Sequence, residues 1–307
     1  AVPSLEALIA AGYEIVGVVT APDKPAGRGQ KMTASAVKNC AVKYGLRILQ
    51  PANLKSIEFQ KELASLNADL FVVVAFRMLP ETVWSMPRLG TFNLHGSLLP
   101  DYRGAAPINW AVMNGETYTG VTTFLLRHEI DTGAIILQEK IAIGSNEKAG
   151  SVHDRMMIIG AELVVKTADA FEIGDVKVIE QDELLKGRLA KSAPKLNRIN
   201  MRINWTAASK KIHDHVRGLS PYPAAYTELV DYSTGIRVEC KILSTAIVDR
   251  KTESGPGTIM TDQRSYLYVN TADSMISVQE LQLAGKQRMQ IKQFLNGFKI
   301  IDDMRFE

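Results

Sequence analysis

The stretch Asn93-Leu94-His95-Gly96-Ser97-Leu98-Leu99-Pro100-Asp101-Tyr102-Arg103-Gly104-Ala105-Ala106-Pro107 indicates an α/β fold with a functional loop at the end of a strand. The preceding run Leu70–Ala75 is continuously apolar, which is typical of a buried parallel strand, and Gly90–Leu94 predicts a second, short strand. Asn93 and His95 are two residues apart and therefore share one face of this second strand. They lie where the chain turns into a Gly- and Pro-rich loop, and open α/β sheets carry their chemistry at such strand ends.

Three polar side chains form a candidate catalytic set. Asn93 supplies a carboxamide donor, His95 an imidazole, and Asp131 a carboxylate within the turn Glu129-Ile130-Asp131-Thr132-Gly133. Acyl transfer to an amine requires an oxyanion donor, a proton carrier and a carboxylate that orients the carrier. Taken singly, an Asn at a strand end is usually a turn former, and Asp131 can be no more than a turn residue. The sequence also leaves open whether Asp131 only orients His95 or takes the amine proton itself.

The pattern Asn-x-His-x-Ser-Leu-Leu-Pro-x-Tyr-Arg-Gly-x-x-Pro, with Asp131-Thr132-Gly133 downstream, resembles the signature of the folate-dependent formyltransferases. The resemblance extends along nearly the whole chain. Thr20–Gly29 resembles the loop after the second strand in the tRNA-formylating members, which their small-molecule relatives mostly lack. Three further segments resemble the linker and the opening helix of the C-terminal domain in those members: Ala193–Leu196, Asn204-Trp205 and Arg217–Pro223.

The resemblance implies transfer of a formyl group from 10-formyltetrahydrofolate to the amino group of methionyl initiator tRNA, in support of translation initiation. It implies no metal and no membrane, and a cytoplasmic enzyme that we expect to be a monomer. The residues that it assigns to the folate site are Ser97, Leu98, Leu99, Pro100, Phe76 and Leu79. The residues that it assigns to tRNA are Arg28, Lys24, Lys31, Lys195 and Arg217.

The chain departs from the family pattern in three places. It opens at Ala1 without the first strand and the Gly-Thr-Pro turn that family members place before this helix, so we expect a strand to be missing from the sequence. The turn Ala75–Pro80 is one residue shorter than its family counterpart, which puts the folate contacts of that loop in question. Asn204 and Tyr222 occupy positions where an Asp and a Trp are usual.

Composition agrees with a globular protein of two domains, because 307 residues with 46% hydrophobic and 22% charged residues can bury two cores. No run of about 18 apolar residues occurs, so no membrane span is expected, and no N-terminal stretch has the layout of a signal peptide. Cys40 and Cys240 are far apart and predict neither a disulfide framework nor a zinc site. His213 and His215 are two residues apart in a predicted helix, where their side chains diverge, and do not predict a metal site either.

The organisation predicted from these patterns is a doubly wound, Rossmann-like, mostly parallel sheet over residues 1–186, a linker at 187–204 and an OB-like barrel at 205–307. Strands are expected at Glu14–Thr20, Tyr118–Leu126 and Ile135–Ile141, and helices after Ser35, after Ser56, from Pro107 and from a capping box at Ser151–Asp154. In the last third, a helix at about Thr206–Arg217 precedes five short β-prone runs: Tyr226–Val230, Arg237–Leu243, Gly257–Met260, Ser265–Asn270 and Met275–Leu283. The barrel is the tRNA-binding part that the resemblance implies.

The charge distribution is uneven. The net charge is +3, but residues from Lys191 onward carry +5 and the preceding residues −2. A positive excess confined to one domain is typical of a phosphate-binding surface, although an ordinary solvated surface explains it equally well. Two other functions stay open at this point. One is another folate-dependent activity, as a sugar-nucleotide formyltransferase or a formyltetrahydrofolate hydrolase, and the basic loop Pro25–Lys31 argues against it. The other is a non-catalytic RNA-binding protein, and the intact catalytic set argues against that.

Overall fold

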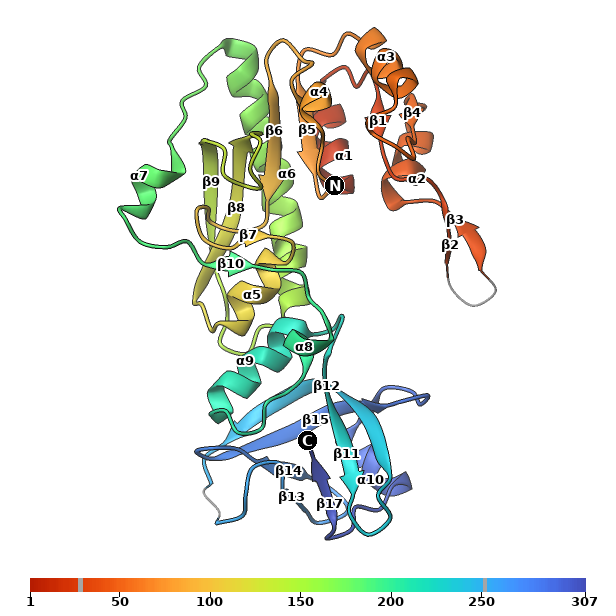
Figure 1. Cartoon of the computed structure of the whole chain (residues 1–307), viewed down its shortest axis with the longest axis vertical. Coiled ribbons are helices and arrows are strands. Elements are labelled where there is room, and N and C mark those ends of the chain that lie inside the picture. Colours follow the sequence, from red (N-terminus) through yellow and green to blue (C-terminus); the bar gives the residue numbers. More distant parts are fainter. Residues whose placement is uncertain (27–29, 251–252) are drawn as a thin grey trace. The chain divides into compact units, whose positions relative to one another are not determined.

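The computed structural model describes residues 1–26, 30–250 and 253–307, which form two compact units (Figure 1). The N-terminal unit comprises Ala1–Gly104, Gly120–Ile141 and Asp154–Ser192. The C-terminal unit comprises Ala105–Thr119, Ala142–His153 and Ala193–Glu307. The chain therefore crosses between the units several times, and its last crossing lies inside the stretch predicted as a linker. That stretch contains regular elements of its own, β10 at Ser192–Ala193 and α8 at Arg198–Met201.

The N-terminal unit is built on a four-stranded sheet in the order β5-β6-β8-β9. Its strands are β5 Phe71–Val74, β6 Thr91–His95, β8 Tyr118–Leu125 and β9 Ile135–Ala142. β5 and β6 are parallel, with Val73 opposite Asn93, whereas β8 is antiparallel to β6, with Thr122 opposite His95. The predicted α/β class is confirmed, and the parallel pairing belongs to the first half of the unit.

A second parallel pair, β1 (Val18–Val19) with β4 (Ile48–Leu49), forms a separate two-stranded sheet. The strand predicted over Glu14–Thr20 is shorter than expected because only these two residues of it have ladder partners. The remaining elements of this unit are α1 Val2–Ala10, β2 Lys24–Ala26, β3 Lys31–Thr33, α2 Ala36–Lys43, α3 Ile57–Ser65, α4 Glu81–Trp84, β7 Arg103–Gly104 and α7 Gln181–Leu185.

Helix starts follow the side-chain caps that the sequence supplies. Ser35 accepts a hydrogen bond from Lys38 N at the start of α2, and Ser56 accepts one from Phe59 N at the start of α3. The capping box predicted at Ser151 is wrong, because the long helix α6 (Ala149–Ile173) begins two residues earlier and Ser151 Oγ donates to Glu147 Oε1.

The core of the N-terminal unit joins α6 to the sheet (Figure 1). Val164, Ala168 and Phe171 on α6 pack against Phe92 of β6, whose ring stacks on that of Phe171 with centroids 5.9 Å apart. Phe92 is fully buried, while its neighbour Asn93 points to the other face of β6. Alternation along β6 therefore separates a packing face from a polar one. No helix among the described residues has the length and apolar content needed to cross a membrane.

The C-terminal unit is a seven-stranded antiparallel sheet in the order β13-β14-β15-β12-β11-β17, with β16 paired to β15. Its strands are β11 Ala225–Asp231, β12 Arg237–Val248, β13 Ile259–Thr261, β14 Leu267–Asn270, β15 Met275–Leu283, β16 Met289–Gln290 and β17 Met304–Phe306. The two outer strands meet, because Phe306 N donates to Gly257 O at 3.0 Å just before β13. A Cβ at Gly257 would lie 2.2 Å from Phe306 O, so only glycine allows this approach. The predicted barrel is confirmed as a nearly closed one.

The helices α9 (Ser209–Leu219), α5 (Pro107–Met113) and α10 (Ile291–Gly297) all contribute side chains to the barrel core. α9 buries Ile212, Val216 and Leu219 among apolar barrel side chains. α5, which begins with proline as predicted, contacts α9, and Asn109 Nδ2 donates to Gly218 O at 2.7 Å. The segment before β8, far from the barrel in sequence, thus belongs to the compact unit of the barrel.

Candidate active site

His95 ends β6 as a buried imidazole, with 6% of its surface exposed. Its Nε2 lies 2.9 Å from the backbone carbonyl oxygen of Tyr102. Because a carbonyl oxygen only accepts hydrogen bonds, Nε2 carries a proton and the tautomer is fixed. The other ring nitrogen, Nδ1, lies 3.7 Å from Asp131 Oδ2. The structure thus brings together two of the three predicted catalytic residues from segments that are 36 positions apart in the sequence.

Asp131 lies in a tight turn with a positive φ of 55°, and 14% of its side chain is exposed. Its Oδ2 accepts a hydrogen bond from Gly104 N at 2.9 Å, so the loop that follows β6 helps to hold the carboxylate. The turn also packs tightly beside β8, because a Cβ on Gly133 would lie 1.6 Å from Leu125 O. The Asp-x-Gly spacing therefore has a steric reason as well as a chemical one.

Gln181 holds this turn through hydrogen bonds to its backbone, a role that was not predicted from the sequence. It is 1% exposed, and its Nε2 donates to the carbonyl oxygens of Asp131 and Gly133 at 2.8 and 2.7 Å. Its Oε1 accepts from Nε and Nη2 of Arg103 at 2.9 and 2.7 Å. The amide thereby ties the Asp131 turn to the residue next to Gly104. No local pattern around Gln181 indicates this role, because its partners are distant in the sequence.

Asn93 carries an unsatisfied polar atom at this site. Within the described part of the chain, its Oδ1 is buried and has no hydrogen-bond partner. Buried polar groups are nearly always paired, and an orphan costs about 1–3 kcal/mol. A rotation of the carboxamide by a half turn presents Nδ2 at the same place. Such an amide is free to bind a ligand oxygen, which agrees with the predicted oxyanion donor.

The predicted folate loop Ser97–Pro100 is held by two polar side chains from the sheet. Thr122 Oγ1 donates to Ser97 O at 2.7 Å and accepts from Leu99 N at 3.2 Å. Gln138 Nε2 donates to Leu99 O at 2.8 Å. Ser97 is fully buried, and its hydroxyl donates to Asp101 O, so this serine is committed to the loop itself. The loop is therefore a rigid surface beside His95.

A bidentate ion pair anchors the far end of the same loop. Arg188 Nη1 and Nη2 donate to the two carboxylate oxygens of Asp101 at 2.7 and 2.8 Å, and Lys191 N donates to Asp101 Oδ1 at 3.0 Å. Partial burial acts to raise the pKa of Asp101, but these hydrogen bonds outweigh it and keep the pKa below its ordinary value. The carboxylate stays charged, and the loop stays fixed.

The remaining predicted residues differ in their surroundings. Phe76 and Leu79 are half-buried and pack against an apolar cluster that contains Phe59 and Val83. The Arg77 guanidinium lies over the Phe76 ring, 5.7 Å from its centroid. These contacts place Phe76 and Leu79 at the edge of the apolar cluster beside β4 and α3, where both side chains stay partly accessible.

Of the residues predicted to contact tRNA, Arg28 lies outside the described residues. Lys24 and Lys31 lie in the antiparallel pair β2–β3, and Lys24 is exposed, as is Lys195. Arg217 requires a correction. It is 4% exposed, its Nε donates to Asp214 Oδ1 at 2.7 Å, and its Nη1 donates to Glu147 O at 3.1 Å. A buried guanidinium with these partners supports α9 and is not part of an exposed basic surface, which is what the prediction required.

Comparison with known proteins agrees with this geometry. Residues 4–167 match the profile of a family described as formyl transferase, and residues 195–299 match the formyl transferase C-terminal domain. The chain is 48% identical over 307 residues to the methionyl-tRNA formyltransferase of Bacteroides fragilis, covering 100% of this chain and 94% of that protein. It is 52% identical to the enzyme of the same name from Parabacteroides distasonis, covering 98% and 93%.

A solved structure shares the fold at low sequence identity. An N-formyltransferase from Helicobacter canadensis, crystallised with folinic acid and dTDP-3-aminofucose, matches with a TM-score of 0.63 and 19% identity. The match covers 94% of this chain and 95% of that one. At this identity the likeness concerns the fold alone, and it includes both units.

Proposed function

The chain belongs to the formyl transferase family, and we propose that it transfers the formyl group of 10-formyltetrahydrofolate to the amino group of methionyl initiator tRNA. The observation that carries the proposal is the set of side chains at the end of β6: Asn93, whose buried Oδ1 has no partner among the described residues, and His95 with Asp131. The relatives named for this activity match essentially the whole chain, which supports the tRNA acceptor over other amines.

The mechanism follows from what each side chain can donate or accept. The methionyl nitrogen attacks the formyl carbon, a tetrahedral oxyanion forms, and the bond from that carbon to the folate N10 breaks. Asn93 Nδ2 donates to the oxyanion, and one such donor is worth roughly 3–4 kcal/mol in the transition state. The attacking nitrogen loses a proton and N10 gains one. His95 Nδ1 and the Asp131 carboxylate are the groups that exchange it.

The tautomer of His95 decides which nitrogen takes part. Tyr102 O occupies Nε2, so only Nδ1 is available for proton exchange. Asp131 stabilises the imidazolium when Nδ1 is protonated, as the carboxylate of a catalytic triad does for its histidine. The hydrogen bond from Gly104 N keeps the carboxylate from turning away from the ring.

The folate site belongs to the N-terminal unit in this proposal, and both units contact tRNA. The backbone of Ser97–Pro100, with Phe76 and Leu79, lines the folate site. Arg28, Lys24 and Lys31 from the N-terminal unit and Lys195 from the C-terminal unit contact tRNA, and the net positive charge lies in the C-terminal third of the chain. The enzyme works in the cytoplasm as a monomer. Its product, the formylated methionyl-tRNA, supports translation initiation.

The test offers formyltetrahydrofolate to the protein with one acceptor at a time: methionyl initiator tRNA, a sugar-nucleotide amine, and water. Formylation of the tRNA alone is the expected result. Formylation of the sugar amine, or release of formate in water at the same rate, would refute the proposed acceptor. His95→Ala and Asp131→Asn variants are assayed beside the wild type, and each should lower kcat by about 10²-fold or more. Arg28→Ala, in the basic loop, should weaken use of the tRNA and leave folate binding unchanged.

A further inference from the structure

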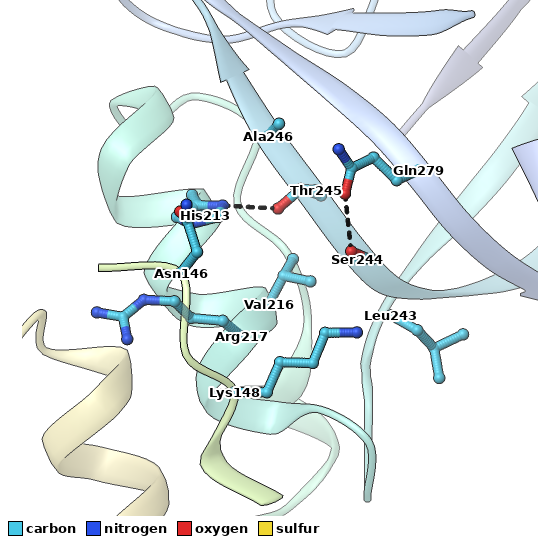
Figure 2. A pocket seen from close by; sticks show the side chains of 10 residues that line it. All are labelled: Asn146, Lys148, His213, Val216, Arg217, Leu243, Ser244, Thr245, Ala246 and Gln279. Atoms are coloured by element: carbon cyan, nitrogen blue, oxygen red, sulfur yellow. Dashed lines mark hydrogen bonds between the residues drawn. The ribbon is translucent and has the colours of Figure 1, made fainter. Parts of the chain in front are cut away.

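A second candidate site is a polar cavity of about 260 Å³ in the C-terminal unit. Figure 2 shows it between the loop before α6, the helix α9 and the strands β12 and β15. Its polar lining comes from Asn146, Lys148, His213, Arg217, Ser244, Thr245 and Gln279. Of these residues, Arg217 belongs to the predicted tRNA set, and none belongs to the predicted catalytic or folate sets. With about 30 Å³ for each liquid water molecule, the cavity has room for a hydrated ionic group.

The hydrogen bonds around His213 determine what Asn146 offers to the cavity. His213 is 5% exposed, with its Nε2 3.2 Å from Asn146 Oδ1 and its Nδ1 3.1 Å from Thr245 Oγ1. The amide oxygen only accepts, so Nε2 carries the proton, and the Thr245 hydroxyl donates to Nδ1 of a neutral ring. Burial lowers the pKa of His213, which favours this neutral form. The oxygen of Asn146 is therefore used, and its NH₂ group remains.

Gln279 is placed in the same way on the opposite wall. Its Oε1 accepts a hydrogen bond from Ser244 Oγ at 2.9 Å, as the dashed line in Figure 2 marks. This again uses the amide oxygen and leaves the NH₂ group. Both carboxamides of the cavity thus have occupied acceptors and spare donors.

Lys148 adds a positive charge to this donor-rich lining. Its Nζ lies 3.8 Å from Glu280 Oε2, at the limit of an ion pair, and about a third of its side chain is exposed. The Glu280 carboxylate is itself held by two short hydrogen bonds from Arg288, at 2.5 and 2.6 Å. The carboxylate charge is therefore already balanced by Arg288, and the ammonium of Lys148 remains largely uncompensated.

The other charged groups beside the cavity do not make the net charge of its lining negative. Arg217 also lines it, and its guanidinium is paired with Asp214 at 2.7 Å. The second oxygen of Asp214 is bound by Lys210 Nζ at 2.5 Å. Two cations thus share one carboxylate, so this wall contributes a further excess of positive charge. The cavity attracts anions.

We propose that this cavity binds a phosphate group, and that in the working enzyme the group is a backbone phosphodiester of the bound tRNA. A phosphate oxygen is an acceptor without a hydrogen to donate, which complements the spare NH₂ groups of Asn146 and Gln279 and the ammonium of Lys148. Such contacts fix the register of a nucleic acid without reading its sequence. The choice of tRNA as the source rests on the proposed function, whereas the preference for phosphate rests on the lining alone.

The first arm of the test measures binding of methionyl initiator tRNA to the full chain over a range of KCl concentrations. Asn146→Asp keeps the oxygen that holds His213, but it replaces the NH₂ donors by a negative charge. We expect it to weaken tRNA binding by about 10-fold, and Lys148→Met by about 3- to 10-fold. Each should also reduce the slope of log K against log salt by about 0.7–0.9, the share of one phosphate. Lys292→Met, an exposed lysine of α10 outside the cavity, is the control for loss of one charge and should change neither quantity.

The second arm separates the two sources of phosphate. Inorganic phosphate alone is titrated against the wild type and Asn146→Asp, with the melting temperature and the imidazole proton resonances of His213 as readouts. Phosphate that shifts the wild type only, together with weakened tRNA binding in both variants, supports the proposal. A phosphate effect with unchanged tRNA binding assigns the site to free phosphate and overturns the tRNA assignment. Wild-type tRNA affinity and salt slope in both folded variants, with no phosphate effect, overturns the site itself.

These outcomes are independent of the proposed reaction. A wild type that fails to formylate methionyl-tRNA would refute the proposed function, whereas the cavity is judged from variants compared with Lys292→Met in binding alone. Asn146→Asp also alters a hydrogen-bond partner of His213 on α9. Lys148→Met is the second variant because its side chain is partly exposed and, among the described residues, makes a single long ion pair.

Discussion

Replacing Gln181 by leucine removes four hydrogen bonds from behind the Asp131 turn at almost constant side-chain volume. The carbonyl oxygens of Asp131 and Gly133 lose their donors, and Arg103 loses its acceptor. Gly133 O is the most deeply buried of these groups, and a buried orphan costs about 1–3 kcal/mol. Asp131 and Arg103 are half-buried, so water replaces part of what they lose. Together we expect the free energy of unfolding to fall by about 3 kcal/mol.

The effect on catalysis should exceed the effect on binding. Without the clamp, the turn is free to shift by about 1 Å, and misplacement on this scale costs about 10²-fold in rate. We therefore expect kcat to fall by about that factor while KM for methionyl-tRNA changes little, because Gln181 touches neither substrate. Gln181→Glu separates the two roles. Its carboxylate still accepts from Arg103, now as an ion pair, but it repels the carbonyl oxygens of the turn, so kcat should fall although the contact with Arg103 is retained.

Urea denaturation, monitored by tryptophan fluorescence, measures the free energy of unfolding. Steady-state formylation assays measure kcat and KM. Gln60→Leu is the matched control, since Gln60 is a half-buried amide that donates to Leu54 O and Thr82 Oγ1 away from the active site. It should leave kcat unchanged. A folded Gln181→Glu enzyme with the kcat of the wild type would show that Gly104 N alone holds Asp131, and the reasoning would be wrong.

Three further results are expected. Asn93→Ala should lower kcat by about 10²- to 10³-fold without lowering the melting temperature, because the buried oxygen that it removes has no partner, and calorimetry beside kinetics checks both parts. Gly133→Ala should lower the free energy of unfolding by about 3 kcal/mol or more, since its Cβ would lie 1.6 Å from Leu125 O; an alanine variant as stable as the wild type would contradict this contact. Burial lowers the pKa of His213 in the folded protein, whereas the unfolded chain keeps the ordinary histidine pKa of about 6.5. The unfolded chain therefore binds more protons below that pH, and the free energy of unfolding should fall as the pH drops. In urea denaturation between about pH 5 and 7, His213→Gln should reduce this dependence of stability on pH.

The local features of this fold could be predicted because they depend on neighbours in the sequence. Ser35 and Ser56 cap their helices, Pro107 opens one, and Asn93 and His95 share a strand face, each through geometry set within a few residues. Other strands were missed because they are very short, and β17, with three residues, exists because the distant strand β11 offers it a ladder partner. The same holds for the return of Ala105–Thr119 to the barrel unit, which depends on contacts of α5 with α9.

The catalytic set also combines features that neighbours in the sequence determine with features that depend on contacts in the fold. The sequence placed Asn93 and His95 together, and the family resemblance added Asp131, but no residue pattern indicates the Gln181 clamp or the hydrogen bond that His95 Nε2 donates to Tyr102 O, which fixes the tautomer. Both are contacts between backbone oxygens and side chains from other segments. Such contacts carry no residue signature, because every residue has a carbonyl group.

Much of the positive charge of the C-terminal unit is paired with carboxylates, as the buried Arg217 illustrates. A count of charges along the sequence treats each cation as available, yet the structure neutralises many of them: Arg217 with Asp214, Arg198 with Glu239, Arg202 with Glu228, Arg237 with Glu307 and Arg288 with Glu280. Among the residues that the structure describes, Lys195, Lys211, Lys292 and Lys299 have no carboxylate within ion-pair distance, and Lys148 has only a distant one. The paired arginines help to hold the barrel together, since their planar forks suit carboxylates. We expect removal of Lys148, whose only carboxylate contact among the described residues is long, to change the salt dependence of tRNA binding more than removal of a closely paired arginine such as Arg198.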